Sequence, residues 1–194
     1  MVRVDVKTIQ RAQRGDLRSF DALVDQCYGM VYNLAYRLLG DSDRACDATQ
    51  DAFVRAYSGL REFRLDASFT TWLYRIATNV SLDELRRRQR GPEEQSLTPA
   101  EDEEERPPVD PPNGGPGPLR QVEAAERQEL VHAALQQLSE DHRTVIVLFD
   151  LQGLSYEEAG AVLGVPLVTV KSRLNRARLS LKAQLAPHRE LLES

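Results

Sequence analysis

The sequence has 194 residues, of which 41% are hydrophobic and 28% charged, and its formal net charge at pH 7 is −5. A chain of this length can bury one core of moderate size or two small ones. It has no apolar run long enough to cross a membrane and no signal-peptide pattern, so we expect a cytoplasmic protein without membrane insertion. Cys27 and Cys46 lie in helical patterns typical of small buried residues, and the three histidines are not spaced with them as metal ligands are. We therefore predict no cofactor and no metal site.

Most of the acidity lies in one segment, residues 91–118. This segment holds eight of the ten prolines and carries a net charge of −7, which leaves +2 for the rest of the chain. Because it is almost free of apolar residues, burial cannot offset the entropy lost on ordering it. We predict a disordered, acidic, proline-rich linker between two helical domains, residues 1–90 and 119–194. No alternating strand pattern reaches useful length, so the expected fold is all-α.

Local signals mark the helices of the first domain, for which we expect a bundle of three to four. Apolar residues recur at helical spacing from Phe20 to Leu38, and Gly40 is a typical helix stop. The segment 41–43 offers candidate N-caps for a second helix. Thr70 or Thr71 is the expected start of a third helix, which Gly91-Pro92 should end.

In the second domain we expect helices near 122–138 and 140–151, followed by a helix-turn-helix over residues 155–182. Ser155 and Glu158 form a capping box, and the turn contains Gly164 and Pro166. The next helix has an apolar stripe and a basic, polar remainder suited to the major groove of DNA; the stripe is Val170, Leu174, Ala177 and Leu181. An ordinary solvated face is the alternative, yet residues 166–189 contain no Asp or Glu.

Three segments resemble those of the extracytoplasmic-function (ECF) sigma factors. They are DRACDATQDAFVRAY (43–57), FTTWLYRIATNVSLDELRRRQR (69–90) and LSEDHRTVIVLFDLQGLSYEEAGAVLGVPLVTVKSRLNRAR (138–178). The resemblance implies a transcription initiation factor, not an enzyme, which directs core RNA polymerase to promoters through their −10 and −35 elements. It also implies contacts with the clamp coiled coil of the largest polymerase subunit and the flap of the second, and control by an anti-sigma factor. The alternative is a stand-alone helix-turn-helix regulator, which would bind duplex DNA without polymerase.

The resemblance assigns candidate binding residues to three surfaces. For polymerase they are Asp43, Asp47, Gln50, Asp51 and Phe53. For single-stranded −10 DNA they are Phe63, Arg64, Ser68, Trp72, Arg75, Asn79, Arg86, Arg87 and Arg88. For the −35 duplex they are Thr169, Lys171, Ser172, Arg173, Asn175, Arg176, Arg178 and Lys182. Among the last group, Lys171, Arg173 and Arg176 are the expected base or nearby phosphate contacts, whereas Arg178 and Lys182 suit phosphates.

Several of these assignments have a structural alternative. At the start of an amphipathic helix, Trp72 is more typical of a core residue than of a base-stacking platform, and Phe53 is expected in the core under either hypothesis. The arginines at 86–88 also suit the dipole of a helix C-terminus. The linker carboxylates could mimic nucleic acid in the polymerase channel or simply be solvated.

Two residues depart from the family pattern. Val168 stands where the family usually has Gly, which restricts the backbone at the start of the recognition helix. Gly160 stands where Ala is usual, and it costs about 1 kcal/mol inside a helix.

Overall fold

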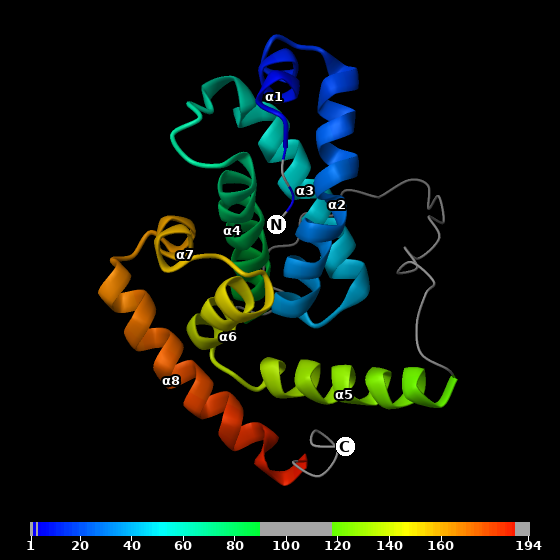
Figure 1. The fold of residues 1–194 in the computed structure, drawn as a ribbon, viewed down its shortest axis with the longest axis vertical. Helices are drawn as coiled ribbons and strands as arrows, with labels where there is room; N and C mark the ends of the chain where they lie inside the picture. The colour runs from blue at the N-terminus through cyan, green and yellow to red at the C-terminus, as the bar shows by residue number, and fades with distance from the viewer. Residues whose placement is uncertain (1, 3, 90–117, 189–194) are drawn as a thin grey trace.

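The computed structural model describes residues 2, 4–89 and 118–188, and the side chains from 127 onward in the second range. Every regular element in these ranges is helical, which confirms the all-α prediction (Figure 1). The elements are α1 (Val6–Gln13), α2 (Leu17–Leu39), α3 (Ser42–Gly59), η1 (Leu60–Glu62), α4 (Phe69–Gln89), α5 (Pro118–Gln136), α6 (Glu140–Ile146), the π-helical η2 (Val147–Leu151), α7 (Tyr156–Leu163), α8 (Leu167–Leu185) and η3 (Ala186–His188). No helix in the described part is both long and apolar enough to cross a membrane. The predicted linker lies outside the described residues except for Pro118, at which α5 begins, so the domain limits stay predictions.

The first domain is built on α2, α3 and α4, which pack against one another, with α1 against α2. Helix α2 ends as predicted, because Gly40 adopts the left-handed conformation and donates its N–H to the Tyr36 carbonyl. Asp41 then caps α3, its side chain accepting the Arg44 N–H at 3.0 Å. Together, the end of α2 at Gly40 and the cap of α3 at Asp41 produce a sharp turn between the two helices. Gln136 of the second domain packs against this turn.

Helix α4 starts earlier than predicted. Its first residue is Phe69, and the Ser68 hydroxyl accepts the Thr71 N–H at 3.0 Å. Thr70 and Thr71 are buried and their hydroxyls lie 2.9 and 2.7 Å from the Ser68 hydroxyl. The expected start at Thr70 or Thr71 is therefore wrong by one or two residues, because the serine before Phe69 supplies the cap.

The second domain confirms the helix-turn-helix. The capping box is complete: the Ser155 hydroxyl accepts the Glu158 N–H, and the Glu158 carboxylate accepts the Ser155 N–H. Gly164 ends α7 in the left-handed conformation, and Pro166 precedes α8. The predicted stripe of α8 faces α6 and α7, with three residues buried and Leu181 partly buried.

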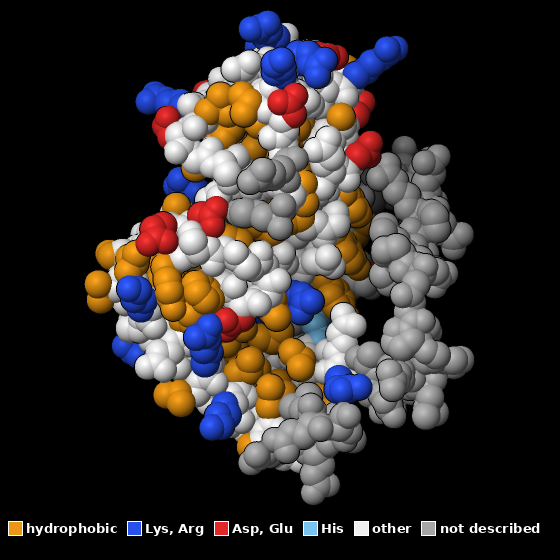
Figure 2. Space-filling view, viewed as in Figure 1, with side chains coloured by type: hydrophobic (Ala, Val, Ile, Leu, Met, Phe, Trp, Pro, Cys, Tyr) orange, Lys and Arg blue, Asp and Glu red, His pale blue; other side chains and the backbone are white. Residues whose placement is uncertain are grey.

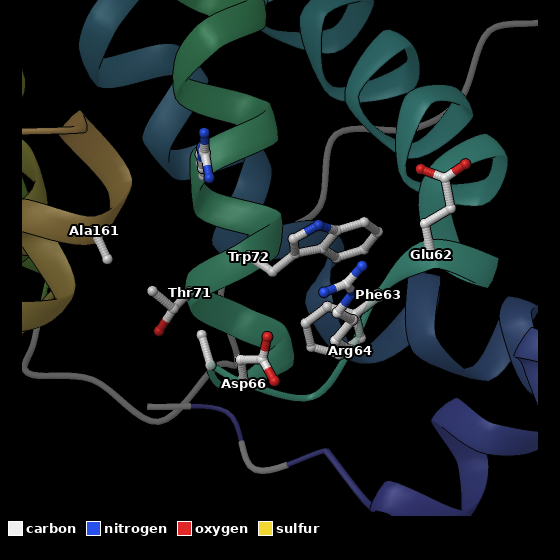
Figure 3. Close-up of a pocket in the computed structure, with 9 residues that line it drawn as sticks. Glu62, Phe63, Arg64, Asp66, Thr71, Trp72 and Ala161 are labelled. Carbon is white, nitrogen blue, oxygen red and sulfur yellow. The ribbon is translucent and has the colours of Figure 1, made fainter.

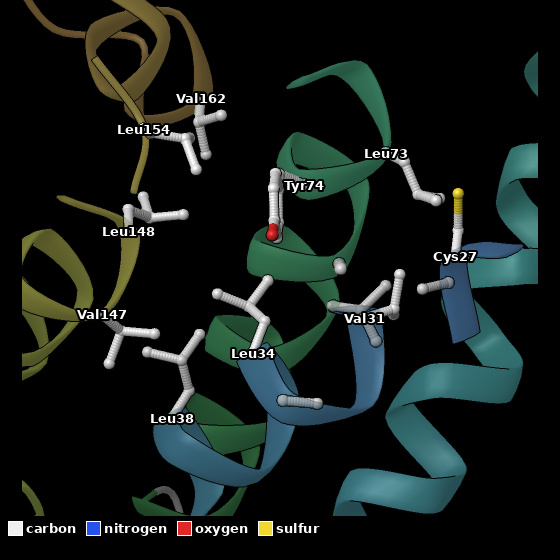
Figure 4. Packing of buried hydrophobic residues seen from close by; sticks show 14 of the residues in the cluster. Cys27, Val31, Leu34, Leu38, Leu73, Tyr74, Val147, Leu148, Leu154 and Val162 are labelled. Carbon is white, nitrogen blue, oxygen red and sulfur yellow. The ribbon is translucent and has the colours of Figure 1, made fainter. Parts of the chain in front are cut away.

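Both domains contribute to one hydrophobic core. Figure 4 shows Leu34 and Leu38 of α2 pointing toward Val147 and Leu148 of η2. Higher in the same view, Tyr74 of α4 points toward residues of the second domain. Helix α4 packs on α7, and α2 packs on α5, α6 and η2. The sequence predicts two domains but does not predict that they share buried residues.

One side chain joins the ends of two helices at this contact. The Arg143 side chain, 8% exposed, donates to the carbonyls of Leu135, Gln136 and Leu138 at 2.8 to 3.2 Å, all at or just after the end of α5. Its Nη1 also donates to the Leu38 carbonyl at the end of α2, in the first domain, and to the Gln136 side chain. Gln136 in turn donates to the Arg37 carbonyl at 3.0 Å. The last carbonyls of α2, which no intrahelical N–H can reach, are thus capped by the other domain.

Glycine at position 40 is required by the same contact. A Cβ atom there would lie 2.7 Å from Cδ of Gln136, besides the strain of a positive φ.

We predict that Arg143→Met lowers the free energy of unfolding by at least about 3 kcal/mol, because it leaves several buried carbonyls without donors. Arg143→Lys should lose less, since an ammonium keeps three donors. Urea unfolding measures both. Arg88→Met, at an exposed site, serves as the control and should change the value by no more than about 0.5 kcal/mol. An unchanged midpoint for Arg143→Met would contradict the capping role.

Cys27 is fully buried, as predicted, whereas Cys46 is only half-buried and lies 3.8 Å from the Tyr28 hydroxyl. Burial raises the pKa of the Cys27 thiol from 9.0 to about 11. The folded protein therefore keeps this proton at pH values at which the unfolded chain releases it.

We predict a loss of stability above pH 9 that comes from Cys27. Its contribution is complete below pH 9 and falls as the pH rises toward 11, with a slope of at most about 1.4 kcal/mol per pH unit. Urea unfolding of the wild type and Cys27→Ala at several pH values tests this, because the variant should show the flatter profile. The Tyr74 hydroxyl, whose pKa burial also raises, leaves both proteins with a residual decline. Parallel profiles for the two proteins would exclude the assignment.

Candidate nucleic-acid interface

A hollow of about 270 Å³ lies where the loop after η1 meets the start of α4 (Figure 3). Phe63, Arg64, Trp72 and Arg75, four of the residues predicted to bind −10 DNA, line it. The remaining wall includes Ala161 of α7, in the second domain. The hollow combines an aromatic ring with two exposed guanidinium groups, which suits a base and its phosphate.

Trp72 is partly packed in the core and partly exposed. Its ring centroid is 4.9 Å from that of Phe63 and 5.6 Å from that of Phe69, so part of the indole is held by the core. The rest is accessible and lines a second hollow together with Ile76 and Asn79. The indole thus contributes to the walls of both hollows.

The predicted −10 residues do not all meet at this place. Phe63 is only 8% exposed, so its ring supports Trp72 rather than presenting a free face. Ser68 is engaged in capping α4. The arginines at 86–88 lie at the other end of α4, roughly 20 Å away along the helix. There Arg86 pairs with Asp83 and Arg87 with Glu84, at 3.5 and 3.3 Å.

Five residues that line the first hollow are absent from the predicted −10 residues: Glu62, Asp66, Ala67, Thr71 and Ala161. The two carboxylates lie beside the arginines and limit the positive charge of the hollow. Ala161 lies 86 residues beyond the last of the other lining residues, Arg75, so no local signal could have placed it there.

The predicted polymerase-binding residues share one helix, α3. Asp43, Asp47 and Gln50 are exposed along it. Asp51 makes two hydrogen bonds to Arg55, at 3.1 and 2.9 Å. Phe53 is 8% exposed and packs in the core, as expected, so its ring offers almost no surface to a partner.

The basic residues of α8 divide into two flanks and an outer ridge. On the flanks, Arg173 pairs with Asp141 at 3.2 Å, and Arg178 makes two hydrogen bonds to Asp150. The second of these pairs raises the pKa of Arg178 further. Lys171 lies over the ring of Tyr156, 5.3 Å from its centroid. Figure 2 shows Lys and Arg side chains spaced along α8, with apolar side chains between them.

The outer ridge of α8 faces away from the buried stripe. At 100° per residue its N-terminal half consists of Val168, Ser172, Asn175 and Arg176, and Leu179 continues the same face. Arg176 and Asn175 are exposed and make no ion pair or hydrogen bond with other residues that the structure describes. The Ser172 hydroxyl donates to the Thr169 carbonyl at 3.1 Å and keeps its lone pairs free. Arg176 is therefore the arginine of α8 whose side chain is free to contact a ligand such as DNA. Arg173 and Arg178 are held in ion pairs in the free protein.

The turn before α8 explains one departure from the family pattern. A Cβ atom at Gly160 would lie 3.1 Å from the carbonyl oxygen of Val165, which is tighter than usual contacts. The missing methyl group therefore lets the turn come close to α7. Val168 is an ordinary helical residue, because Leu65 is the one described non-glycine residue with a positive φ. Although valine restricts the backbone more than glycine does, Val168 adopts an ordinary helical conformation without strain.

Comparison with known proteins identifies the family of the chain. The sigma-70 region 2 family matches residues 23–91, and the sigma-70 region 4 family matches residues 128–181. The chain is 40% identical over 190 residues to RNA polymerase sigma-H factor of Pseudomonas aeruginosa, covering 94% of each chain. The chain belongs to the ECF group of the sigma-70 family. ECF RNA polymerase sigma-E factor of Escherichia coli is 34% identical over 188 residues, covering 94% of this chain and 95% of the relative.

A solved structure has the same fold. The sigma factor RpoE of Bartonella quintana, in complex with the anti-sigma factor NepR, superposes with a TM-score of 0.64 at 26% identity, covering 87% of this chain and 98% of that one. The family decides between the two functional hypotheses, because a stand-alone regulator would not carry a sigma region 2. This sigma factor is a transcription initiation factor that directs RNA polymerase to promoters, and it is not an enzyme.

Two hydrogen bonds tie the second domain to α4. The Tyr74 hydroxyl donates to Gln152 at 2.8 Å, and the Thr71 hydroxyl donates to Glu158 at 3.3 Å. Both donors are buried, and both acceptors belong to the second domain.

We predict that Tyr74→Phe costs about 1 kcal/mol of stability through the lost bond to Gln152. A double-mutant cycle with Gln152→Ala should give a coupling energy of at least about 0.5 kcal/mol. Tyr57→Phe, at an exposed tyrosine of α3, is the matched control and should be neutral. Zero coupling between Tyr74 and Gln152 would mean that the two domains are separate in solution.

Proposed function

We propose that this sigma factor docks on core RNA polymerase through α3, captures an unstacked −10 base beside Trp72 and reads the −35 duplex with the outer ridge of α8. It then acts where polymerase acts, in the cytoplasm. The domain limits at 1–90 and 119–194 and the intervening linker belong to the same proposal.

The −35 assignment is carried by the outer ridge. A recognition helix contacts base edges with the residues near its N-terminus. The ridge places Ser172, Asn175 and Arg176 on the face that its own domain leaves uncovered. Serine and asparagine side chains can both donate and accept at base edges, and arginine can take guanine O6 and N7 together. The flanking Arg173, Arg178 and Lys182 suit the phosphates on either side of the groove.

The −10 assignment is supported by the two hollows that Trp72 lines. A flipped base needs an aromatic or apolar surface, a polar group for its edge and a cation for its phosphate. Trp72, Asn79 and Arg75 supply these three elements within two turns of α4. Arg64 provides a second cation from the loop.

The polymerase assignment is supported by the charge of α3. Its exposed face carries Asp43 and Asp47, with Gln50 between them and the Asp51–Arg55 pair. An acidic helix face suits a basic partner, such as the family's contact on the clamp coiled coil. The second domain would contact the flap. An anti-sigma factor, such as the one in the Bartonella complex, would hold both domains away from these partners.

The test is reconstitution with core polymerase, followed by mapping of transcription starts and by binding and opening assays at one mapped promoter. Arg176→Ala should weaken closed-complex formation at least about fivefold, because a base contact of this kind is worth roughly 1–3 kcal/mol. Asn79→Ala and Arg75→Ala should leave closed complexes intact and reduce opening, seen with 2-aminopurine in the −10 element. Asp47→Lys should weaken core binding. Arg14→Ala, in the exposed turn after α1, is the control for lost positive charge.

Failure to bind core, or transcription starts no different from those of core alone, would contradict the proposal. Loss of function in Arg14→Ala would show that the assays report general charge rather than the assigned surfaces.

A further inference from the structure

Val168 is the most exposed large hydrophobic side chain in the described part of the chain. Its exposed fraction is 76%, compared with 0% for Val170 two residues later. It lies in the first turn of α8, two residues after Pro166. No side chain of its own domain covers it, so packing within the fold gives no reason for a valine at this point.

The position of Val168 on the helix indicates what it could contact. It is the first residue of the outer ridge, four residues before Ser172 and seven before Asn175, so the three side chains follow one line along the helix. Recognition helices insert their N-terminal residues deepest among the base edges. Val168 is thus the apolar tip of the N-terminal half of the ridge, in which the other members, Ser172, Asn175 and Arg176, are polar or basic.

We propose that Val168 is a specificity residue that contacts a thymine methyl group in the −35 element. The inference rests on the proposed function of α8 as the −35 reader. In the major groove, the bases present hydrogen-bond donors, acceptors and one apolar group, the C5 methyl of thymine. A valine side chain cannot exchange hydrogen bonds with any of the polar groups, and the methyl group is the one that it can desolvate favourably.

The neighbours of Val168 make this contact selective. The side chains of Ser172 and Asn175 can form hydrogen bonds with the edges of adjacent bases. Arg176, the next residue along the helix, supplies a positive charge beside them. A cytosine or guanine opposite Val168 would lose hydration from its polar edge without a protein partner.

The experiment uses holoenzyme assembled from core polymerase and the full chain, with a promoter duplex recovered by transcription-start mapping. Each thymine of the −35 element is replaced in turn by uracil, which removes only the methyl group. For the wild type, one uracil substitution should weaken closed-complex binding about fourfold, as expected for one buried methyl-sized group. Val168→Ala should bind the thymine duplex about fourfold more weakly and should be insensitive to that same uracil.

Two variants separate this inference from the function on which it rests. Leu179→Ala removes another exposed apolar side chain of α8, 63% exposed and roughly 16 Å further along, and it should keep the full uracil effect. Arg176→Ala should weaken binding while the uracil effect persists. If Val168→Ala keeps the full uracil effect at every thymine while Arg176→Ala loses binding, the Val168 contact is excluded and the −35 assignment stands. If Arg176→Ala binds normally, the assignment of α8 itself fails.

Discussion

The buried guanidinium of Arg143 fixes how the two domains meet. The ends of α2 and α5 both present carbonyls that no helical N–H can reach, and in this fold they point at the same place. A planar group with five donors can serve both ends at once, which an ammonium could not. The negative ends of the two helix dipoles also favour a cation there. Once Arg143 is seated and Gln136 has capped Arg37, the second domain has little freedom of orientation relative to α2.

The orientation set by Arg143 brings α7 against α4, and Glu158 is the residue that serves both sides of this contact. One of its carboxylate oxygens completes the capping box with Ser155, and the other accepts from Thr71 at the start of α4. The same packing places Ala161 in the wall of the hollow beside Trp72. The surface proposed for the −10 base is therefore shaped partly by the domain proposed for the −35 element. A ligand that enlarges this hollow must act against the buried contacts between the domains.

The sequence predicts the features that depend on neighbouring residues and misses those that depend on distant ones. Gly40, Asp41 and the Ser155 capping box follow from local rules, and the structure confirms each. The partner of Arg143 at Leu38 is 105 residues away, so its capping role has no sequence signal. For the same reason the placement of Ala161 in the wall of the hollow has no sequence signal. On α8, periodicity separates the buried stripe from the polar surface, but it cannot distinguish a free arginine from one held by a carboxylate in another helix.

Whether an arginine of α8 is free or held in an ion pair matters for how the helix can bind DNA. The side chains of Arg173 and Arg178 are 30% and 50% exposed, and ion pairs of such exposed groups contribute little to stability, about 0–1 kcal/mol. A DNA phosphate can therefore displace Asp141 or Asp150 at low cost, and the arginines are already oriented on the two sides of the ridge. In the absence of DNA, the same carboxylates reduce the net charge of the helix. Because non-specific affinity follows the number of phosphates neutralised, this arrangement lowers binding to arbitrary duplex and leaves more of the discrimination to the outer ridge.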